Sequence, residues 1–243
     1  MTPAADWLLP DWPAPARVKA CVTTRAGGVS LPPFDTFNLG DHVEDDLQAV
    51  THNRQCLSAR IECSPAWLRQ VHGVVVADAD PAIVAEADAS WTAKTGVACA
   101  VLTADCLPVL FCDRAGTRVA AAHAGWRGLA GGVLEATLAA LAVPASEVLV
   151  WLGPAIGPQA FEVGGEVRDV FLADHPQAAS AFVPSVNAGR FMADIYALAR
   201  LRLAACGVSS VYGGGFCTVT DPRFYSYRRA ARTGRFASLV WLD

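Results

Sequence analysis

The fold of this chain is decided by two short blocks, T-A-D-C-L-P-V-L-F at 103–111 and A-A-H-A-G-W-R-G at 121–128. The segment between them, 112–119, is long enough for one hairpin, so the apolar runs 107–112 and 117–122 are predicted to be neighbouring strands. Cys106 comes just before the first run and His123 just after the second. We therefore expect these two side chains to lie on neighbouring elements.

A third block, R-Q-V-H-G at 69–73, adds His72, and a thiolate with two imidazoles is a ligand set that suits zinc. His72, Cys106 and His123 are separated by 34 and 17 residues, which is not a local metal motif, and the ordinary alternative for each is a buried core residue. Each lies beside glycine, proline or a charged residue, where strands end and sites open. This context favours a metal site.

Three protein ligands would leave tetrahedral zinc one open position for water, which is the arrangement of a catalytic site. Asp105 precedes Cys106, and its role is either to orient a ligand or move a proton, or to cap the turn. Arg127 lies on the glycine-rich turn after His123, where it either clamps a phosphate or forms a surface salt bridge. Backbone N–H groups of the turn at 125–132 can also receive an anion.

A metal-free chemistry would use the same atoms. Cys106 would then be a thiolate nucleophile and His123 its base, with Asp105 or another residue as the orienting group. This alternative leaves His72 without a role, whereas the metal site uses all of the trio. The histidines elsewhere are expected to be exposed or structural: His42, His52 and His175.

The composition indicates a soluble globular protein. A chain of 243 residues can bury ~70–75% of its extended surface, and no apolar run approaches the ~18–20 residues of a membrane span. The start, M-T-P-A-A-D-W-L-L-P-D-W, lacks the basic and apolar regions of a secretory signal, so we expect a cytoplasmic protein without a membrane partner. The eight cysteines are then expected to be free thiols.

The charge pattern argues against a nucleic-acid partner. The formal net charge is −4, and acidic and basic residues are mixed along the chain. The exception is a group of arginines near the end, which can meet a small anion such as phosphate: Arg228, Arg229, Arg232 and Arg235.

Hydrophobic periodicity predicts an α+β protein with a mixed sheet system. Beyond the hairpin, strands are expected at 17–24, 67–77 (with His72 in its middle), 96–102, 148–152, 209–212 and 238–242. Helices are expected from Asp45 or Asp46 to about Cys63, and at 133–141, 163–173 and 191–206, the last ended by Gly207. No repeat or linker composition divides the chain, so residues 1–243 are predicted to form a single domain.

These blocks resemble the YfiH family, also called the multicopper polyphenol oxidase or laccase-domain family and described as a purine nucleoside phosphorylase family. The resemblance covers nearly the whole chain. It includes T-T-R-A-G-G-V-S at 23–30, N-L-G-D-H-V at 38–43, G-P-A-I-G-P at 153–158, F-E-V-G at 161–164 and F-Y-S-Y-R-R at 224–229.

The resemblance implies a four-layer α/β/β/α fold and a zinc ion bound by His72, Cys106 and His123. It also implies phosphorolysis of adenosine, inosine, guanosine and methylthioadenosine, and deamination of adenosine to inosine. Purine nucleosides and phosphate would be the partners of a monomer or small homo-oligomer. Substrate contacts are expected in the matching blocks, at Asn38, Gln70 and Tyr225.

Copper is the alternative metal, because some members of the family were described as copper-dependent phenol oxidases; one bacterial branch is linked to peptidoglycan editing. A blue-copper centre also uses a weak axial methionine, and the chain has only Met1 and Met192, which argues against an electron-transfer site. One departure from the family pattern is A-D-A-S-W-T at 87–92, where Trp91 is expected to alter the rim of the pocket.

Overall fold

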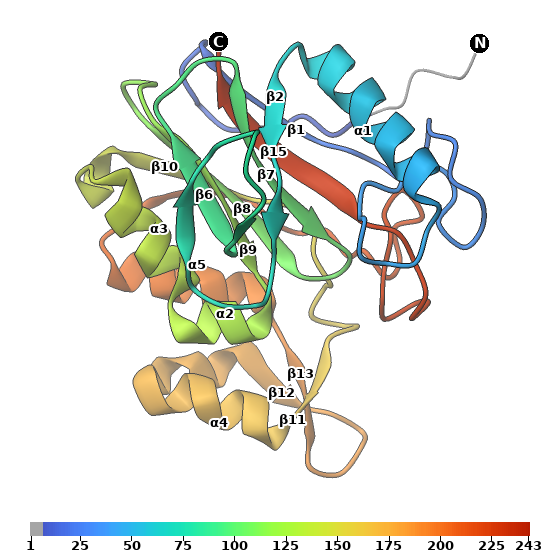
Figure 1. Cartoon of the computed structure of the whole chain (residues 1–243). Coiled ribbons are helices and arrows are strands. Elements are labelled where there is room, and N and C mark those ends of the chain that lie inside the picture. The colour runs from blue at the N-terminus through green and yellow to red at the C-terminus, as the bar shows by residue number, and fades with distance from the viewer. Residues whose placement is uncertain (1–6) are drawn as a thin grey trace.

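The computed structural model describes residues 7–243, so residues 1–6, the first half of the segment M-T-P-A-A-D-W-L-L-P-D-W, lie outside it. Two stacked β-sheets form its centre (Figure 1). The first has the strand order β1-β15-β7-β2, with β1 at Val18–Val22, β15 at Phe236–Leu242, β7 at Val97–Thr103 and β2 at Ser64–Ala66. The second has the order β14-β10-β8-β9-β6-β4, with β14 at Ser210–Gly213, β10 at Val148–Leu152, β8 at Leu107–Asp113, β9 at Val119–Ala124, β6 at Ala89–Thr92 and β4 at Val76–Asp78.

Helices cover the outer faces of the two sheets. Helix α1 (Leu47–Ile61) lies on one side, and α2 (Trp126–Gly131), α3 (Val133–Leu141) and α5 (Ile195–Ala205) lie on the other, as Figure 1 shows. Three buried clusters fill the three spaces between these layers. The predicted α+β class and the four-layer α/β/β/α order are therefore confirmed.

The apolar runs of the sequence form strands that are buried on both faces. In β7, Ala100 and Leu102 pack toward α1, while Cys99 and Val101 pack toward the second sheet. Alternate side chains of a strand point to opposite faces, so a strand between two packed layers needs apolar residues at every position. This explains why β7 and β8 appear in the sequence as continuous apolar runs rather than as alternating patterns.

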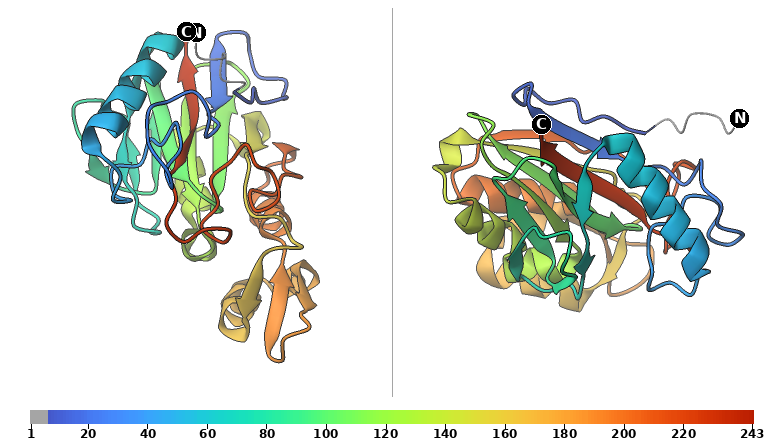
Figure 2. Two further views of the ribbon diagram at one scale, coloured as in Figure 1. Left: turned by 90° about the vertical axis from the view of Figure 1, so that its right-hand side faces the viewer. Right: turned by 45° about the horizontal axis from the view of Figure 1, so that its top comes forward.

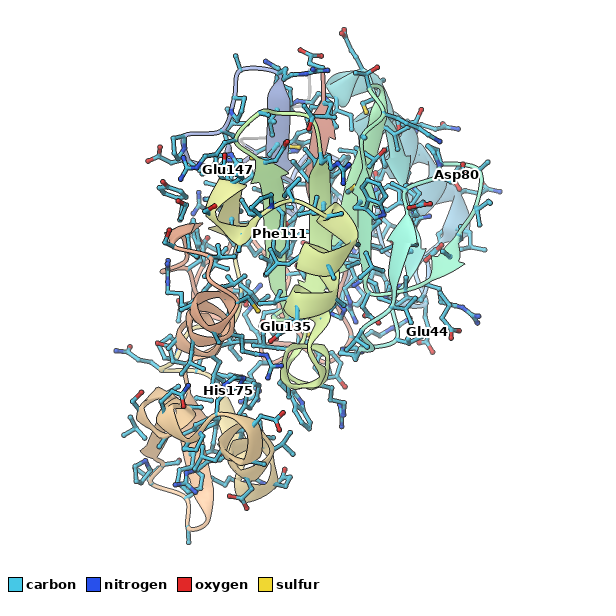
Figure 3. All side chains as sticks on the ribbon, turned by 90° about the vertical axis from the view of Figure 1, so that its left-hand side faces the viewer. Glu44, Asp80, Phe111, Glu135, Glu147 and His175 are labelled. Atoms are coloured by element: carbon cyan, nitrogen blue, oxygen red, sulfur yellow. The ribbon has the colours of Figure 1, made fainter. Side chains whose placement is uncertain are left out.

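Phe111 of β8 is a sensitive position in the outer core, where it packs with its cluster beneath α3 (Figure 3). Its side chain has no exposed surface. Replacing Phe111 by Ala is expected to lower the free energy of unfolding by about 3–5 kcal/mol, because the closed layers cannot collapse into the cavity. Urea denaturation followed by circular dichroism measures this, and a loss below ~1 kcal/mol would contradict the packing described here.

A smaller unit extends from the sheets at one end of the molecule (Figure 2). It contains β11 (Glu162–Gly164), α4 (Gly165–Asp174), the short helix η2 (Pro176–Ala181), β12 (Phe182–Pro184) and β13 (Arg190–Ala193). Its core residues, such as Phe171 and Phe182, continue the cluster beneath the second sheet. That residues 1–243 form one folding unit remains a prediction, which this continuity supports. The remaining elements are β3 (Leu68–Arg69), β5 (Ala85–Glu86) and the short helix η1 (Ala145–Glu147).

Two predicted elements are wrong. The strand expected at 67–77 is interrupted: β3 ends at Arg69, β4 begins at Val76, and His72 lies between them in a turn with φ of 62°. The helix expected at 191–206 begins only at Ile195, because residues 190–193 pair with β11 as strand β13. Tertiary pairing overrides helical periodicity there.

Other boundaries follow the sequence closely. The side chain of Asp46 accepts a hydrogen bond from the Gln48 N–H and caps α1, which ends at Ile61. Gly207 has φ of 83° just after α5, as its position predicted. The helix expected at 163–173 starts two residues later, after β11. All eight cysteines are free thiols, and no helix in 7–243 combines the length and apolar character needed to cross a membrane.

Candidate metal centre and pocket

The predicted trio meets at one end of the β8–β9 hairpin. Antiparallel pairing places Pro108 opposite His123, so Cys106, two residues before Pro108, lies beside the His123 ring. His72 arrives from the turn between β3 and β4. One ligand atom from each residue lies within 4.8 Å of the others, and Cys106 Sγ is 3.8 Å from His72 Nε2. Residues far apart in sequence thus form one cluster.

The geometry of the trio fits a tetrahedral metal ion. Zinc–sulfur and zinc–nitrogen bonds of ordinary length hold S and N ligand atoms roughly 3.5 Å apart, close to the separation between Cys106 and His72. The imidazole rings of His72 and His123 meet edge to face with centroids 4.7 Å apart. Gly125 is needed beside them, since a Cβ there would lie 2.8 Å from His72 Cδ2 and 3.0 Å from Cys106 Sγ. A soft sulfur and two imidazoles suit zinc and also copper.

Protonation in the trio favours a thiolate. Burial raises the pKa of the Cys106 thiol, but the neighbouring imidazoles of His123 and His72 outweigh burial and bring this pKa from 9.0 down to about 6. Burial lowers the pKa of His123, whereas the Cys106 sulfur and the Asp88 carboxylate raise it, with a net rise. The thiolate is the form that binds metal and attacks electrophiles.

Asp88 positions both histidines, although it was not among the site residues predicted from the sequence. Its Oδ1 lies 2.8 Å from His123 Nδ1 and accepts the His72 backbone N–H at 2.9 Å. Its Oδ2 accepts the N–H groups of Val71 and Gly73. With Nδ1 of His123 directed at Asp88, Nε2 is left to face the trio. The signal in the sequence was a carboxylate between two small apolar residues, in A-D-A at 87–89.

The trio lines a cavity of about 380 Å³, a size typical of small-molecule sites. One wall is apolar and comes mainly from α2, α5 and the segments before β11: Trp126, Ile156, Phe161 and Ile195. Other residues of the lining are polar: His42, Gln70, Asp105, Tyr227, Arg228 and Arg235. The cavity therefore offers a flat apolar surface, a soft donor set and positive charge to one ligand.

Arg235 supplies a cation without a direct carboxylate partner, although the Asp105 carboxylate and the Cys106 sulfur interact with its charge at longer range. Within the described chain, no acidic oxygen lies within 4.0 Å of its guanidinium, which donates instead to the carbonyl oxygens of Thr233 and Gly234. Burial lowers the pKa of Arg235, yet an arginine stays charged at neutral pH. An unpaired, partly buried guanidinium at a cavity wall favours binding of an anion.

Three sequence-predicted residues do not reach the cavity. Arg127 is exposed, its guanidinium lies over the Trp126 ring at 4.5 Å, and its role as a phosphate clamp stays a prediction. Tyr225 is fully buried and donates its hydroxyl to the Phe34 carbonyl. Asn38 is also fully buried, and its Oδ1 accepts the Arg235 N–H at 2.8 Å. Asn38 and Tyr225 thus support the site from within the core rather than contacting a ligand.

Gln70 and Asp105 do line the cavity, but their polar atoms are already bonded. The Gln70 amide exchanges two hydrogen bonds with the backbone of Leu102. The Asp105 carboxylate accepts from the Thr218 hydroxyl and from the Arg228 N–H, each at 2.6 Å. Asp105 therefore fastens the C-terminal segment to the turn before Cys106, and the group that orients His123 is Asp88.

Two further positions bear on the shape of the cavity. His42 is exposed, as expected, and it also lines the cavity beside Arg235. Trp91 lies in β6 against the outer core, with Arg118 over its ring at 5.6 Å, and it does not line the cavity. The expected effect of Trp91 on the pocket rim is therefore wrong.

Fold and site together define the class of protein: an α/β/β/α frame with a His₂Cys donor set at the floor of a small-molecule cavity. Residues 19–243 match the family model described as multi-copper polyphenol oxidoreductase laccase, and the chain belongs to this family. This confirms the resemblance seen in the sequence.

Relatives with a named activity are similar to this chain over nearly its whole length. The chain is 72% identical to a purine nucleoside phosphorylase of Pseudomonas aeruginosa, over 98% of each chain. It is 53% identical to the purine nucleoside phosphorylase YfiH of Escherichia coli, over 97% of this chain and 98% of that one. These names support an enzyme.

Solved structures share the fold. A crystal structure of a Neisseria meningitidis protein superposes with a TM-score of 0.95 at 55% identity, covering 98% of this chain and 99% of that one. The structure of YlmD from Geobacillus stearothermophilus gives a TM-score of 0.92 at 30% identity, covering 100% of this chain and 98% of that one.

Proposed function

We propose that this chain catalyses the phosphorolysis of purine nucleosides, with zinc held by His72, Cys106 and His123. The observation that carries the proposal is that one cavity joins this donor set to the unpaired guanidinium of Arg235 and to an apolar wall. The names of the relatives support the same activity. Adenosine, inosine, guanosine and methylthioadenosine are the proposed substrates.

Different residues of the cavity bind the base and the phosphate. Trp126 and Phe161 offer the base an apolar surface, and Arg235 binds charged phosphate oxygens through its N–H groups. A phosphate held there is positioned to attack the ribose C1′ while the purine departs. When bound, zinc would supply Lewis-acid stabilisation of negative charge at the floor of the cavity.

Deamination of adenosine has weaker support from the geometry. This reaction needs a carboxylate that can move protons at the purine ring. Among the described residues, Asp105 is the only carboxylate that lines the cavity, and both of its oxygens already accept hydrogen bonds from the protein. Phosphorolysis does not need such a carboxylate, so we propose it as the main activity.

Copper is the second metal that the donor set suits, in keeping with the description of the family model. The described part of the chain places no methionine at the cavity, because Met192 lies in β13 opposite Glu162. A blue-copper site with an axial methionine is therefore not favoured. Oxygen uptake with a phenol substrate is the experiment that would detect a copper oxidase.

A metal-free thiol hydrolase is the second candidate function, because Asp88, His123 and Cys106 form an ordered acid–base–nucleophile series. His123 lies between the Asp88 carboxylate and the Cys106 sulfur. This is the geometry of a cysteine nucleophile activated by an oriented imidazole. The two candidates differ in their response to chelation.

Phosphorolysis is tested with zinc-loaded protein, inosine and phosphate, following hypoxanthine and ribose 1-phosphate by chromatography. Replacing Cys106 by Ser is expected to lower kcat/KM at least ~100-fold, because the thiolate donor is lost. Cys56→Ser, at an exposed cysteine of α1, is the matched control and should leave kcat/KM unchanged. A chelator should abolish turnover and zinc should restore it. Turnover that survives chelation but not thiol alkylation would instead support the hydrolase.

A further inference from the structure

The polar wall of the cavity contains a histidine beside Arg235 that the proposed chemistry does not yet use. His42 lies in the loop between β1 and α1, and its side chain is 57% exposed, so a ligand in the cavity can reach it. Arg235 approaches from the start of β15. These two groups come from opposite ends of the chain and meet on one face of the cavity.

The fold holds this pair in place through Asn38. The Asn38 amide bonds to both the N–H and the carbonyl of Gly40, and its Oδ1 also accepts the Arg235 N–H. Gly40 admits the arginine stem, since a Cβ there would lie 2.8 Å from Arg235 Cγ. One buried amide therefore fixes the spacing between the His42 loop and Arg235.

The charges around His42 make it a neutral hydrogen-bond acceptor. Partial burial and the charge of Arg235 lower the pKa of His42 below 6.5, and the neighbouring Asp41 only partly offsets them. Asp41 lies 3.5 Å from Nδ1 of the ring and is itself held by Arg54 at 3.2 Å. With its N–H at Nδ1 toward Asp41, the ring keeps a lone pair at Nε2.

We propose that His42 contacts the phosphate substrate, accepting the P–OH hydrogen bond of HPO₄²⁻ at Nε2 while Arg235 binds the charged oxygens. This inference deepens the proposed phosphorolysis and rests on it. A guanidinium has only donors, so it cannot accept the hydrogen bond that the P–OH group of this anion donates. An acceptor beside a donor is therefore the pair that recognises HPO₄²⁻.

The reaction balances with this assignment. A charged phosphate oxygen forms the bond to the ribose C1′, and the bond from C1′ to the purine nitrogen breaks with its electron pair on the purine. The purine then needs one proton, and the P–OH group has one to lose, so the products are the dianion of ribose 1-phosphate and a neutral base. His42 lies on the phosphate side, where that proton leaves.

The first test measures binding of inorganic phosphate to the zinc-loaded full chain by titration calorimetry, which needs no turnover. His42→Ala is expected to weaken phosphate binding about tenfold, the value of one hydrogen bond of ordinary strength. His42→Gln should largely retain binding, because its amide oxygen can accept the same hydrogen bond. His52→Ala, on the exposed face of α1, is the matched control and should bind phosphate as the wild type does.

The second test compares Michaelis constants in phosphorolysis. His42→Ala should raise the KM for phosphate and leave the KM for inosine within twofold. A change confined to the inosine KM, an unaltered phosphate affinity in His42→Ala, or a wild type that binds no phosphate would each overturn the inference. Phosphate binding that depends on His42 without any phosphorolysis would leave the inference standing and refute the proposed function.

Discussion

Replacing Asp88 by Ala is expected to weaken zinc binding about 10- to 100-fold, although Asp88 is not itself a ligand in the proposed site. One carboxylate orients the His123 ring and holds the turn that carries His72. That turn places a non-glycine residue at positive φ, a conformation that needs support from its surroundings. Without Asp88, both imidazoles would lose their fixed directions. Competition with a chromophoric chelator measures the affinity.

Asp113→Ala is the matched control for Asp88→Ala. Asp113 is also a buried carboxylate that accepts backbone N–H groups, here from Thr117 and Arg118 at the far end of the same hairpin. Both variants should lose stability, roughly 2–3 kcal/mol for an unpaired buried group, but only Asp88→Ala should lose zinc. Asp88→Asn, which keeps one acceptor oxygen, should fall between the wild type and Asp88→Ala. Wild-type zinc affinity in Asp88→Ala would contradict the positioning role.

Replacing Arg235 by Ala is expected to lower kcat/KM for phosphate about 100-fold. The reason is that the variant loses two charge-assisted hydrogen bonds to phosphate, which together stabilise the bound phosphate by ~3 kcal/mol. Arg235→Lys should recover only part of the loss, because a lysine cannot reproduce the planar pair of donors. Initial rates at varied phosphate and saturating inosine measure the effect.

Arg127→Ala is the informative comparison for Arg235→Ala. The sequence made Arg127 the expected phosphate clamp, but its guanidinium is exposed over Trp126. Its removal should change kcat/KM for phosphate less than twofold. If Arg127→Ala were the more damaging of the two variants, the anion site would lie on the glycine-rich turn and not on the cavity wall.

The strands of the β8–β9 hairpin could be predicted well, because their apolar character is visible in short continuous stretches of the sequence. A short continuous apolar run such as 107–112 favours a strand buried on both faces, and the hairpin between the runs 107–112 and 117–122 set the register. Periodicity predicted the wrong element at 67–77, because the turn at His72 depends on the carboxylate of Asp88, which lies just before β6. It was wrong again at 190–193, which pair with β11 instead of extending α5.

The candidate site also has some features that the sequence predicts and others that it does not. The donor types of the metal trio are fixed by the residues themselves, so His72, Cys106 and His123 could be named in advance. Which arginine lines the cavity could not be named in advance, because Arg127 and Arg235 are the same residue type in equally plausible segments. The two arginines differ in their burial and in the groups around them, and neither property can be read from a short stretch of sequence.

By itself, the sequence determined the α+β class through its hydrophobic periodicity, the family and its layered fold through the matching blocks, and the three candidate metal ligands through their side-chain chemistry. Only the tertiary structure decided that Asp88 orients both histidines, that Asn38 braces the polar wall, and that His42 and Arg235 face one cavity. The physical reason is that these roles depend on the burial of each side chain and on its distance from segments far away in sequence. Only the packing of the layers brings those segments together.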